Sequence, residues 1–175
     1  MGRADFCPMG GNIMMQAVIM AGGKGTRLAA LTKDEIPKPM VPVAGKPLLL
    51  WQVERLKENG ITDIIMVIGH LGDKIREYFG DGEKFGVAIR YFEETEPLGT
   101  AGSFYYLKDM IHGDRFVMMS GDLFFDIDFQ RMINFHEEKG AVATLFVHPN
   151  GHPFDSDLLV LDSNDRITKF DSKHN

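Results

Sequence analysis

The sequence contains a single cysteine, Cys7, and no long apolar run. One cysteine cannot form an internal disulfide, and it has no partner at metal-binding spacing, which fits a reducing compartment. A membrane-spanning helix needs about 20 consecutive apolar residues, and no stretch of this chain approaches that length. The N-terminus also lacks the basic-then-apolar order of a secretory signal. These features predict a cytoplasmic protein with no membrane partner.

Positive charge is also scarce. The chain has 19 Lys and Arg residues against 25 Asp and Glu residues, which gives a net charge of -6. A general nucleic-acid surface needs a basic face that releases counterions from the phosphate backbone. The charge balance therefore argues against a nucleic-acid partner, and any phosphate binding has to be local.

The length of 175 residues, 44% of them hydrophobic, is enough for one domain with a hydrophobic core and too short for two ordinary domains. Residues 1–14 show neither helical nor strand periodicity, so we expect a flexible leader before a folded domain that covers 15–175. The sequence stops soon after a short strand pair. This predicts a C-terminally truncated piece of a longer protein.

Apolar runs and helical patterns alternate along the chain and predict an α/β fold with a mostly parallel sheet covered on both faces. The predicted strands cover 16–21, 63–69, 87–94, 115–122 and 141–147, the predicted helices cover 47–60, 73–80, 99–111 and 129–140, and two short strands flank a turn at 163–165. In such sheets ligands bind beyond the carboxyl ends of the strands. This selects the segments after Ala21 and Phe92 and the pair Gly121 and Asp122.

The stretch MAGGKGTRLAALTKDEIPKPM, residues 20–40, places glycines directly after a buried strand and before a short predicted helix. Glycines let backbone N–H groups turn toward an anion, and a helix N-terminus adds partial positive charge. The stretch is therefore typical of a triphosphate cradle, with a plain tight turn as the alternative. A dinucleotide fingerprint fails because Leu28 stands at the third glycine position, and a Walker loop fails because the lysine precedes Gly25.

Lys38 stands between Pro37 and Pro39. Two prolines restrict the backbone on both sides and disfavour a helix, so we expect Lys38 on stiff, extended backbone. A rigidly placed cation suits phosphoryl or nucleotidyl transfer, where catalysis is mostly positioning and charge stabilisation. A solvated lysine in a proline-rich loop is the alternative interpretation.

The segment AVIMAGGKGTRLAALTKDEIPKPMVPVAGKPLL, together with EPLGTAG and SGD, resembles the signature of the sugar-1-phosphate nucleotidyltransferases, most closely the mannose-1-phosphate and manno-heptose 1-phosphate guanylyltransferases. The resemblance extends over roughly residues 16 to 173. It implies a Rossmann-like three-layer sandwich with a mostly parallel, mixed sheet. It also implies an enzyme that joins a nucleoside triphosphate to a sugar 1-phosphate and releases pyrophosphate.

The resemblance also implies roles for individual residues. Arg27 and Lys38 would hold and neutralise the phosphates, and Asp122 would act in catalysis and bind Mg²⁺, a hard cation that takes carboxylate and phosphate oxygens. The implied nucleotide-binding residues are Ala21, Gly22, Gly23, Gly25, Thr26, Glu94, Pro97, Gly99 and Thr100, and the implied substrate-binding residues are Gly121 and Lys173.

Glu94 occupies the position where relatives that use uridine, thymidine or adenosine nucleotides tend to carry glutamine. A carboxylate only accepts hydrogen bonds, and guanine offers N1–H and N2–H₂ donors along one edge, so Glu94 predicts GTP. Two alternatives remain: an exposed acidic loop, or Glu96 as the residue that reads the base.

Other features leave the substrate and the reaction open. The family's second metal-binding aspartate has no counterpart, and Ser172 stands where many relatives carry a sugar-binding glutamate. Two alternative functions therefore stay open: a nucleotidyltransferase for UTP, dTTP or CTP, and a non-catalytic nucleotide- or sugar-binding domain. Two kinds of protein partner also stay open, a second copy of the chain in a homo-oligomer and a fused partner enzyme. Asp126 and Asp128 fit a turn and a helix cap, and a loop is favoured over a metal site for the set His148, His152, Asp155 and Asp157.

Overall fold

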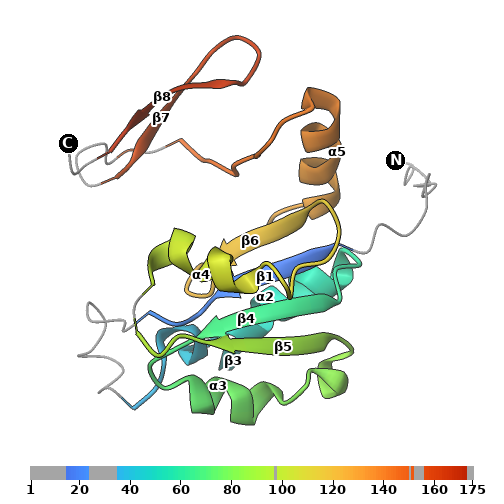
Figure 1. Ribbon diagram of the computed structural model, residues 1–175, viewed down its shortest axis with the longest axis vertical. Helices are drawn as coiled ribbons and strands as arrows, with labels where there is room; N and C mark the ends of the chain where they lie inside the picture. The colour runs from blue at the N-terminus through green and yellow to red at the C-terminus, as the bar shows by residue number, and fades with distance from the viewer. Residues whose placement is uncertain (1–14, 24–34, 97, 150, 152–155, 173–175) are drawn as a thin grey trace. The chain divides into compact units, whose positions relative to one another are not determined.

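The computed structural model describes residues 15–23, 35–96, 98–149, 151 and 156–172 (Figure 1). Contacts divide the chain into two compact units, with the boundary between Gln130 and Arg131. The elements in chain order are β1 (Gln16–Met20), η2 (Lys38–Met40), β2 (Pro42–Val43), β3 (Lys46–Pro47), α2 (Leu48–Glu58), β4 (Asp63–Ile68), α3 (Gly72–Phe79), η3 (Glu83–Phe85), β5 (Ala88–Glu93), α4 (Gly99–Leu107), β6 (Phe116–Ser120), α5 (Phe129–Lys139), β7 (Leu158–Leu161) and β8 (Ile167–Asp171).

The first unit contains a four-stranded sheet in the order β5-β4-β1-β6, with every neighbouring pair parallel. The two central strands, β1 and β4, are almost completely buried. Strands that are covered on both faces read as continuous apolar runs, which is why QAVIM and DIIMVI could be identified from the sequence. The predicted α/β fold with a parallel central sheet is confirmed.

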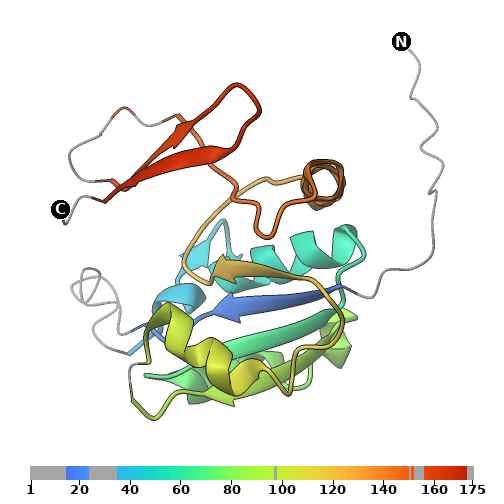
Figure 2. The same ribbon diagram turned by 45° about the horizontal axis from the view of Figure 1, so that its top comes forward.

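Helices cover both faces of this sheet. On one face, Leu107 of α4 packs in a buried cluster with Val18 of β1 and Ile65 and Val67 of β4. Figure 2 shows α2 and α4 on opposite faces of the sheet. Alternate residues of a strand point to opposite faces, so the two helices bury the two alternating sets of strand side chains.

Helix α2 follows the pattern that the sequence predicts. Leu49, Val53 and Leu56 recur at helical spacing and are fully buried, and Pro47 precedes the first helical residue. Beyond the last residue, Gly60 has φ +78°, a conformation that glycine adopts easily. In the part of the chain that the structure describes, no helix is long and apolar enough to cross a membrane.

The path of the chain through the sheet locates a switch in direction. From β1 the chain moves to β4 and then to β5 on one side, and it later returns to place β6 on the other side of β1. In parallel sheets, ligands typically bind beyond the carboxyl ends of the strands at such a switch point, here between β1 and β6.

The predicted bounds of two elements are wrong. Residues 141–147 are irregular rather than a strand, because in the described part of their unit β7 and β8 pair only with each other and offer this segment no ladder. Helix α4 ends at Leu107, four residues before the predicted end at 111, where the N–H groups of Met110 and Ile111 close a final turn on the Leu107 carbonyl.

The second unit contains most of α5 and the antiparallel hairpin β7-β8, which confirms the predicted strand pair. Asp162 Oδ1 accepts hydrogen bonds from the backbone N–H groups of Asn164 and Arg166, at 2.8 and 2.9 Å. Asp165 has φ +65° in the turn. A short polar side chain that bonds its own backbone favours such a turn.

Candidate functional site

The carboxyl edge of the parallel sheet brings four segments together. Backbone hydrogen bonds continue past the strand ends, from Ala21 N–H to the Val67 carbonyl at 2.7 Å and from Gly121 N–H to the Met20 carbonyl at 2.8 Å. The N–H of Glu94 donates to the Ile68 carbonyl at 2.8 Å. The predicted site segments after β1, β5 and β6 therefore lie along one edge, together with the residues after β4.

Gly22 and Gly69 make the closest backbone approach at this edge. A Cβ added to Gly69 would lie 2.9 Å from the carbonyl oxygen of Gly22, and one added to Gly22 would lie 3.3 Å from the amide nitrogen of Gly69. Only residues without a side chain can pack this way. Gly69 is not among the site residues that the sequence predicts, although it carries the same signal as Gly22, since each glycine closely follows a buried strand.

Lys38 begins a single 3-10 turn, η2, so the prediction of extended backbone at this residue is wrong. The N–H of Met40 donates to the Pro37 carbonyl at 2.7 Å, and the N–H of Val41 donates to the Lys38 carbonyl at 3.2 Å. Proline is compatible with a first helical turn, because the N–H groups there need no partner within the turn. Pro39 is thus accommodated, and Pro37 keeps the extended conformation just before the turn.

The structure brings Lys38 and Asp122 into an ion pair, although they lie 84 residues apart in the sequence. Lys38 Nζ donates to Asp122 Oδ2, and 31% and 30% of the two side chains are exposed. Ser120 Oγ donates to the other carboxylate oxygen, Oδ1, at 2.6 Å. The sequence does not single out Ser120, which lies at the end of β6 and holds the carboxylate from its strand side.

The environment of Asp122 keeps its carboxyl group ionised. Partial burial is the largest single influence and raises the pKa of Asp122, but hydrogen bonds from Lys38 and Ser120 and the charge of Lys38 together outweigh it. The pKa of Asp122 therefore lies below its usual value. At neutral pH the carboxyl edge of the sheet therefore presents the partly exposed Lys38 beside the ionised carboxylate of Asp122.

Glu94 lies next to the glycine segment. Ser103 Oγ, fully buried in α4, donates a hydrogen bond to Glu94 Oε1. The other oxygen, Oε2, lies 3.1 Å from the position that a Cβ on Gly22 would occupy. One oxygen of Glu94 is thus held from α4, and the carboxylate lies beside the backbone of the predicted nucleotide loop.

The donor set at Asp122 limits what kind of metal ion it can hold. In residues 15–23, 35–96, 98–149, 151 and 156–172, no three acidic, histidine or cysteine side chains gather into a metal cluster. Mg²⁺ commonly takes one or two protein carboxylates and completes its shell with phosphate oxygens and water. Asp122 therefore fits a magnesium ion that is shared with a phosphate ligand, rather than a site made by protein alone.

The remaining predicted residues divide into two groups. Gly99 and Thr100 open α4, at the amino end of the helix whose Ser103 contacts Glu94. Outside the described residues lie the leader 1–14, the short helix expected after the glycines, and Gly25, Thr26, Arg27, Pro97, His152, Asp155 and Lys173. Asp126, expected in a turn, forms an ion pair with Arg55.

A family model described as nucleotidyl transferase matches residues 16–174. The chain is 42% identical over 129 residues to a D-glycero-alpha-D-manno-heptose 1-phosphate guanylyltransferase of Campylobacter jejuni, covering 74% of this chain and 57% of that protein. It is 36% identical over 172 residues to a UTP--glucose-1-phosphate uridylyltransferase of Synechocystis, covering 91% of this chain and 44% of that protein. The chain thus spans about half the length of these curated relatives.

A solved structure shares the fold. HddC from Yersinia pseudotuberculosis, complexed with GMP-PN, superimposes with a TM-score of 0.71 at 26% sequence identity, covering 91% of this chain and 70% of that chain. The likeness includes the Rossmann-like arrangement of a parallel sheet between helices, as the sequence predicts.

Proposed function

The chain belongs to the nucleotidyl transferase family, and we propose that it transfers a guanylyl group from GTP to a sugar 1-phosphate and releases pyrophosphate. The observation that carries this proposal is the Lys38–Asp122 pair at the carboxyl edge of the sheet. Asp122 follows β6, and Gly121 just before it lies against Met20 and Ala21 at the end of β1. A cation, a carboxylate and exposed backbone amides are the groups that phosphate transfer requires.

In the proposed reaction an oxygen of the sugar 1-phosphate attacks the α-phosphorus of GTP. A new bond forms between that oxygen and the α-phosphorus, the bond from the α-phosphorus to the α,β-bridging oxygen breaks, and the electron pair leaves with pyrophosphate. The attacking phosphate is already an anion, so no general base and no covalent enzyme intermediate are needed. What the protein has to supply is alignment and positive charge.

Lys38 suits the second requirement. Its ammonium group has three N–H donors, so it can retain Asp122 while it donates to phosphate oxygens. The 3-10 turn and the flanking prolines hold its backbone, which reduces the reorganisation needed when phosphate binds. By the resemblance, Arg27 would grip the departing pyrophosphate with its planar fork of donors.

The family generally uses a divalent metal ion, and Asp122 is the residue that would hold Mg²⁺ here. When bound, the ion would neutralise charge on the phosphates. Asp122 stays ionised, and Ser120 orients its carboxylate by the bond to Oδ1. The protein thus presents a fixed oxygen ligand at the place where phosphates meet Lys38.

Glu94 supports GTP as the nucleotide. A carboxylate can accept from both N1–H and N2–H₂ of guanine, and it offers no donor to the carbonyl groups of uracil or thymine. Ser103 holds Oε1 of Glu94 beside Gly22. The sugar would be of the manno type, mannose or a heptose, because the motif resemblance and the Campylobacter relative share this configuration.

Nucleotide titrations test the proposal. We expect the chain to bind GTP more tightly than UTP, dTTP or CTP in isothermal titrations with Mg²⁺, and to release pyrophosphate when mannose 1-phosphate or the heptose analogue is added. GTP binding without pyrophosphate release with either sugar would favour a non-catalytic binding domain. Preference for another nucleotide would reject the guanylyl assignment but leave the family intact.

The Glu94→Gln variant sharpens the choice of base. It replaces one acceptor oxygen by an amide donor, so we expect the ratio of GTP to UTP affinity to fall about tenfold or more. Glu93→Gln is the matched control, because Glu93 is the adjacent residue and pairs with Arg76 instead. If the ratio of GTP to UTP affinity is unchanged in Glu94→Gln, Glu94 does not recognise the base.

A further inference from the structure

Gln52 of α2 is buried, with 2% of its surface exposed, and its side-chain amide reaches the segment that carries Asp122. Its Nε2 donates to the carbonyl of Ser120 at 3.0 Å and to the carbonyl of Leu123 at 2.6 Å. These two carbonyls stand on either side of Asp122 in the sequence. One side chain from another layer of the fold therefore holds the backbone both before and after the predicted metal ligand.

We propose that Gln52 is a positioning residue that sets the direction of the Asp122 carboxylate toward Lys38 and toward a phosphate-bound metal ion. This inference rests on the proposed function for the role of Asp122. It concerns the same site and adds a buried residue that lies outside the motif segments on which the resemblance rests.

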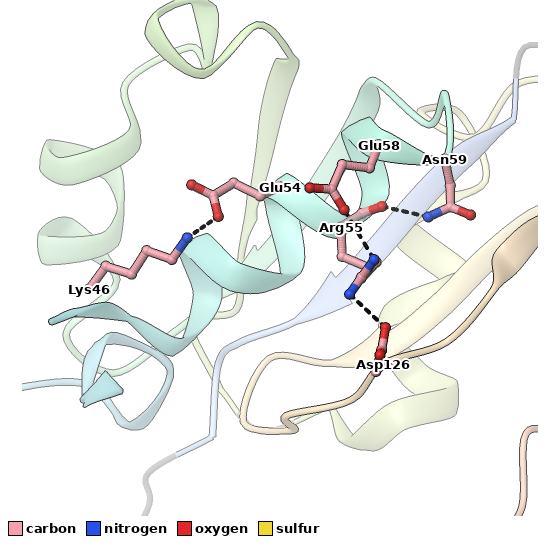
Figure 3. Close-up of polar contacts among 6 residues, drawn as sticks. All are labelled: Lys46, Glu54, Arg55, Glu58, Asn59 and Asp126. Carbon is pink, nitrogen blue, oxygen red and sulfur yellow. Dashed lines mark hydrogen bonds and ion pairs between the residues drawn. The ribbon is translucent and has the colours of Figure 1, made fainter. Parts of the chain in front are cut away.

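Two neighbours of Gln52 reinforce the attachment. The ring of Trp51 meets the ring of Phe124 edge-on with 5.9 Å between centroids. One turn further along α2, Arg55 Nη2 approaches Asp126 Oδ1 at 2.5 Å, an ion pair that Figure 3 shows together with the bond from Asn59 to the Arg55 carbonyl. Helix α2 thus holds the segment 120–126 at several points, with Gln52 as the buried one.

The chemistry of the amide explains why this position is glutamine. A primary amide has two N–H donors on one nitrogen, so a single side chain can satisfy two carbonyls. The other end of the group, Oε1, is buried without a partner among the described atoms, which is unfavourable. An apolar side chain would avoid that unfavourable term but would leave the Ser120 and Leu123 carbonyls without their donor.

Gln16 provides a matched control within the same chain. It is equally buried, at 1% exposed, and its Nε2 also donates to two acceptors, Asp63 Oδ2 at 2.8 Å and the Met110 carbonyl at 3.2 Å. It lies at the amino end of β1, opposite to the predicted site. Replacing either glutamine by methionine, which has a similar shape and no donor, removes two donated bonds, and at Gln16 it also removes the acceptor of the His112 N–H, so the control loses at least as many bonds.

The experiment compares Gln52→Met with Gln16→Met in the full chain by two measurements. The first is amide hydrogen exchange at residues 121–126. The second is the gain in GTP affinity that Mg²⁺ provides, taken as the ratio of dissociation constants in EDTA and in Mg²⁺. For Gln52→Met we expect exchange to speed up about tenfold or more and the Mg²⁺-dependent gain to fall about tenfold, as for residues that orient metal ligands. For Gln16→Met we expect lower thermal stability with neither change.

Other results would overturn the inference. Exchange at 121–126 that stays at the wild-type rate in Gln52→Met shows that Gln52 does not hold this segment, and equal effects of the two variants show a general structural role. If Mg²⁺ does not improve GTP binding even in the wild-type chain, the proposed metal function fails, and the exchange measurement alone decides the role of Gln52. If Gln52→Met does not fold, Gln52→Asn, whose amide is too short to reach both carbonyls, replaces it.

Discussion

Each end of the parallel sheet has a buried glutamine near charged residues, but the two glutamines differ in how completely their amides are hydrogen-bonded. At the amino end, Gln16 donates to Asp63 and to the Met110 carbonyl and accepts from the N–H of His112, so every part of its amide is bonded. Arg90 completes the cluster with a contact to Asp63 at 3.1 Å. At the carboxyl end, Gln52 leaves its Oε1 without a partner among the described atoms.

Exposure of the charged side chains does not separate the two ends, because Lys38 and Asp122 are 31% and 30% exposed while Arg90 and Asp63 are 38% and 39% exposed. What the carboxyl end has in addition is open backbone at the exposed Gly23, where a Cβ would meet nothing within 4 Å. The amino end satisfies its buried polar groups within the protein, which stabilises the fold and leaves little capacity for a ligand. The comparison teaches that incomplete hydrogen bonding and open backbone, rather than charge alone, distinguish the candidate site from a structural polar cluster.

Removing the Lys38 ammonium should have the largest effect. In Lys38→Ala we expect pyrophosphate release from GTP and a sugar 1-phosphate to fall about a hundredfold to a thousandfold, because a fixed charge at the phosphates is lost. The free energy of unfolding should change by less than about 1 kcal/mol, since the pair is partly exposed to solvent. Steady-state kinetics and urea unfolding measure the two effects.

Lys46→Ala is the control for this variant. Lys46 also pairs with a carboxylate, that of Glu54 (Figure 3), and its Nζ lies 3.5 Å from the centroid of the Trp51 ring. It should retain wild-type turnover. If turnover fell equally in the two variants, or stayed normal in a folded Lys38→Ala chain, Lys38 would have no special role at the phosphates.

A side chain at Gly69 should have an intermediate effect. The added Cβ in Gly69→Ala would approach the Gly22 carbonyl oxygen at 2.9 Å and force the nucleotide loop to shift. We expect GTP affinity to fall about tenfold, which corresponds to overpacking by about 1.4 kcal/mol. Isothermal titration measures this, with Gly151→Ala as the control, because a Cβ there meets nothing within 4 Å. Wild-type GTP affinity in Gly69→Ala would show that the close approach is not needed.

The smallest expected effect is the pH dependence of stability at Asp122. Its pKa is lowered in the folded chain, so its contribution is present above the unfolded pKa of about 3.9 and is lost as the pH falls through the folded value. At pH 7, Asp122→Asn should be less stable than wild type by under about 1 kcal/mol, because solvent screens the pair. In urea unfolding the difference should close in acid. A gap that persists unchanged in acid would contradict the lowered pKa.

Much of the fold was predictable because strands that are buried on both faces consist of continuous apolar residues, which can be seen in the sequence. QAVIM and DIIMVI are continuous apolar runs, and α2 repeats its apolar residues at helical spacing. The failed strand at 141–147 has the same apolar character as the successful ones. Its failure shows that a strand also depends on a partner, which a local pattern cannot supply.

The site was predictable only in part. Glycines after a strand, the proline-flanked Lys38 and the aspartate after β6 stand out along the chain, because their residue types suit phosphate chemistry. Gln52 and Ser103 do not stand out, since a glutamine or serine inside a helical pattern is unremarkable until the tertiary structure shows what it bonds. Lys38 was expected on extended backbone because a local rule for proline ignores the tolerance of a first turn.

The sequence by itself determined the order of most strands and helices, the glycines directly after β1 and the charged residues available for phosphate, because these depend on side-chain periodicity and backbone freedom over short ranges. Only the tertiary structure decided that Lys38 meets Asp122 and that α2 holds the segment beyond β6. Such contacts join residues far apart in the chain. They arise because parallel strands align their carboxyl ends at one edge while their connecting helices pack across the faces.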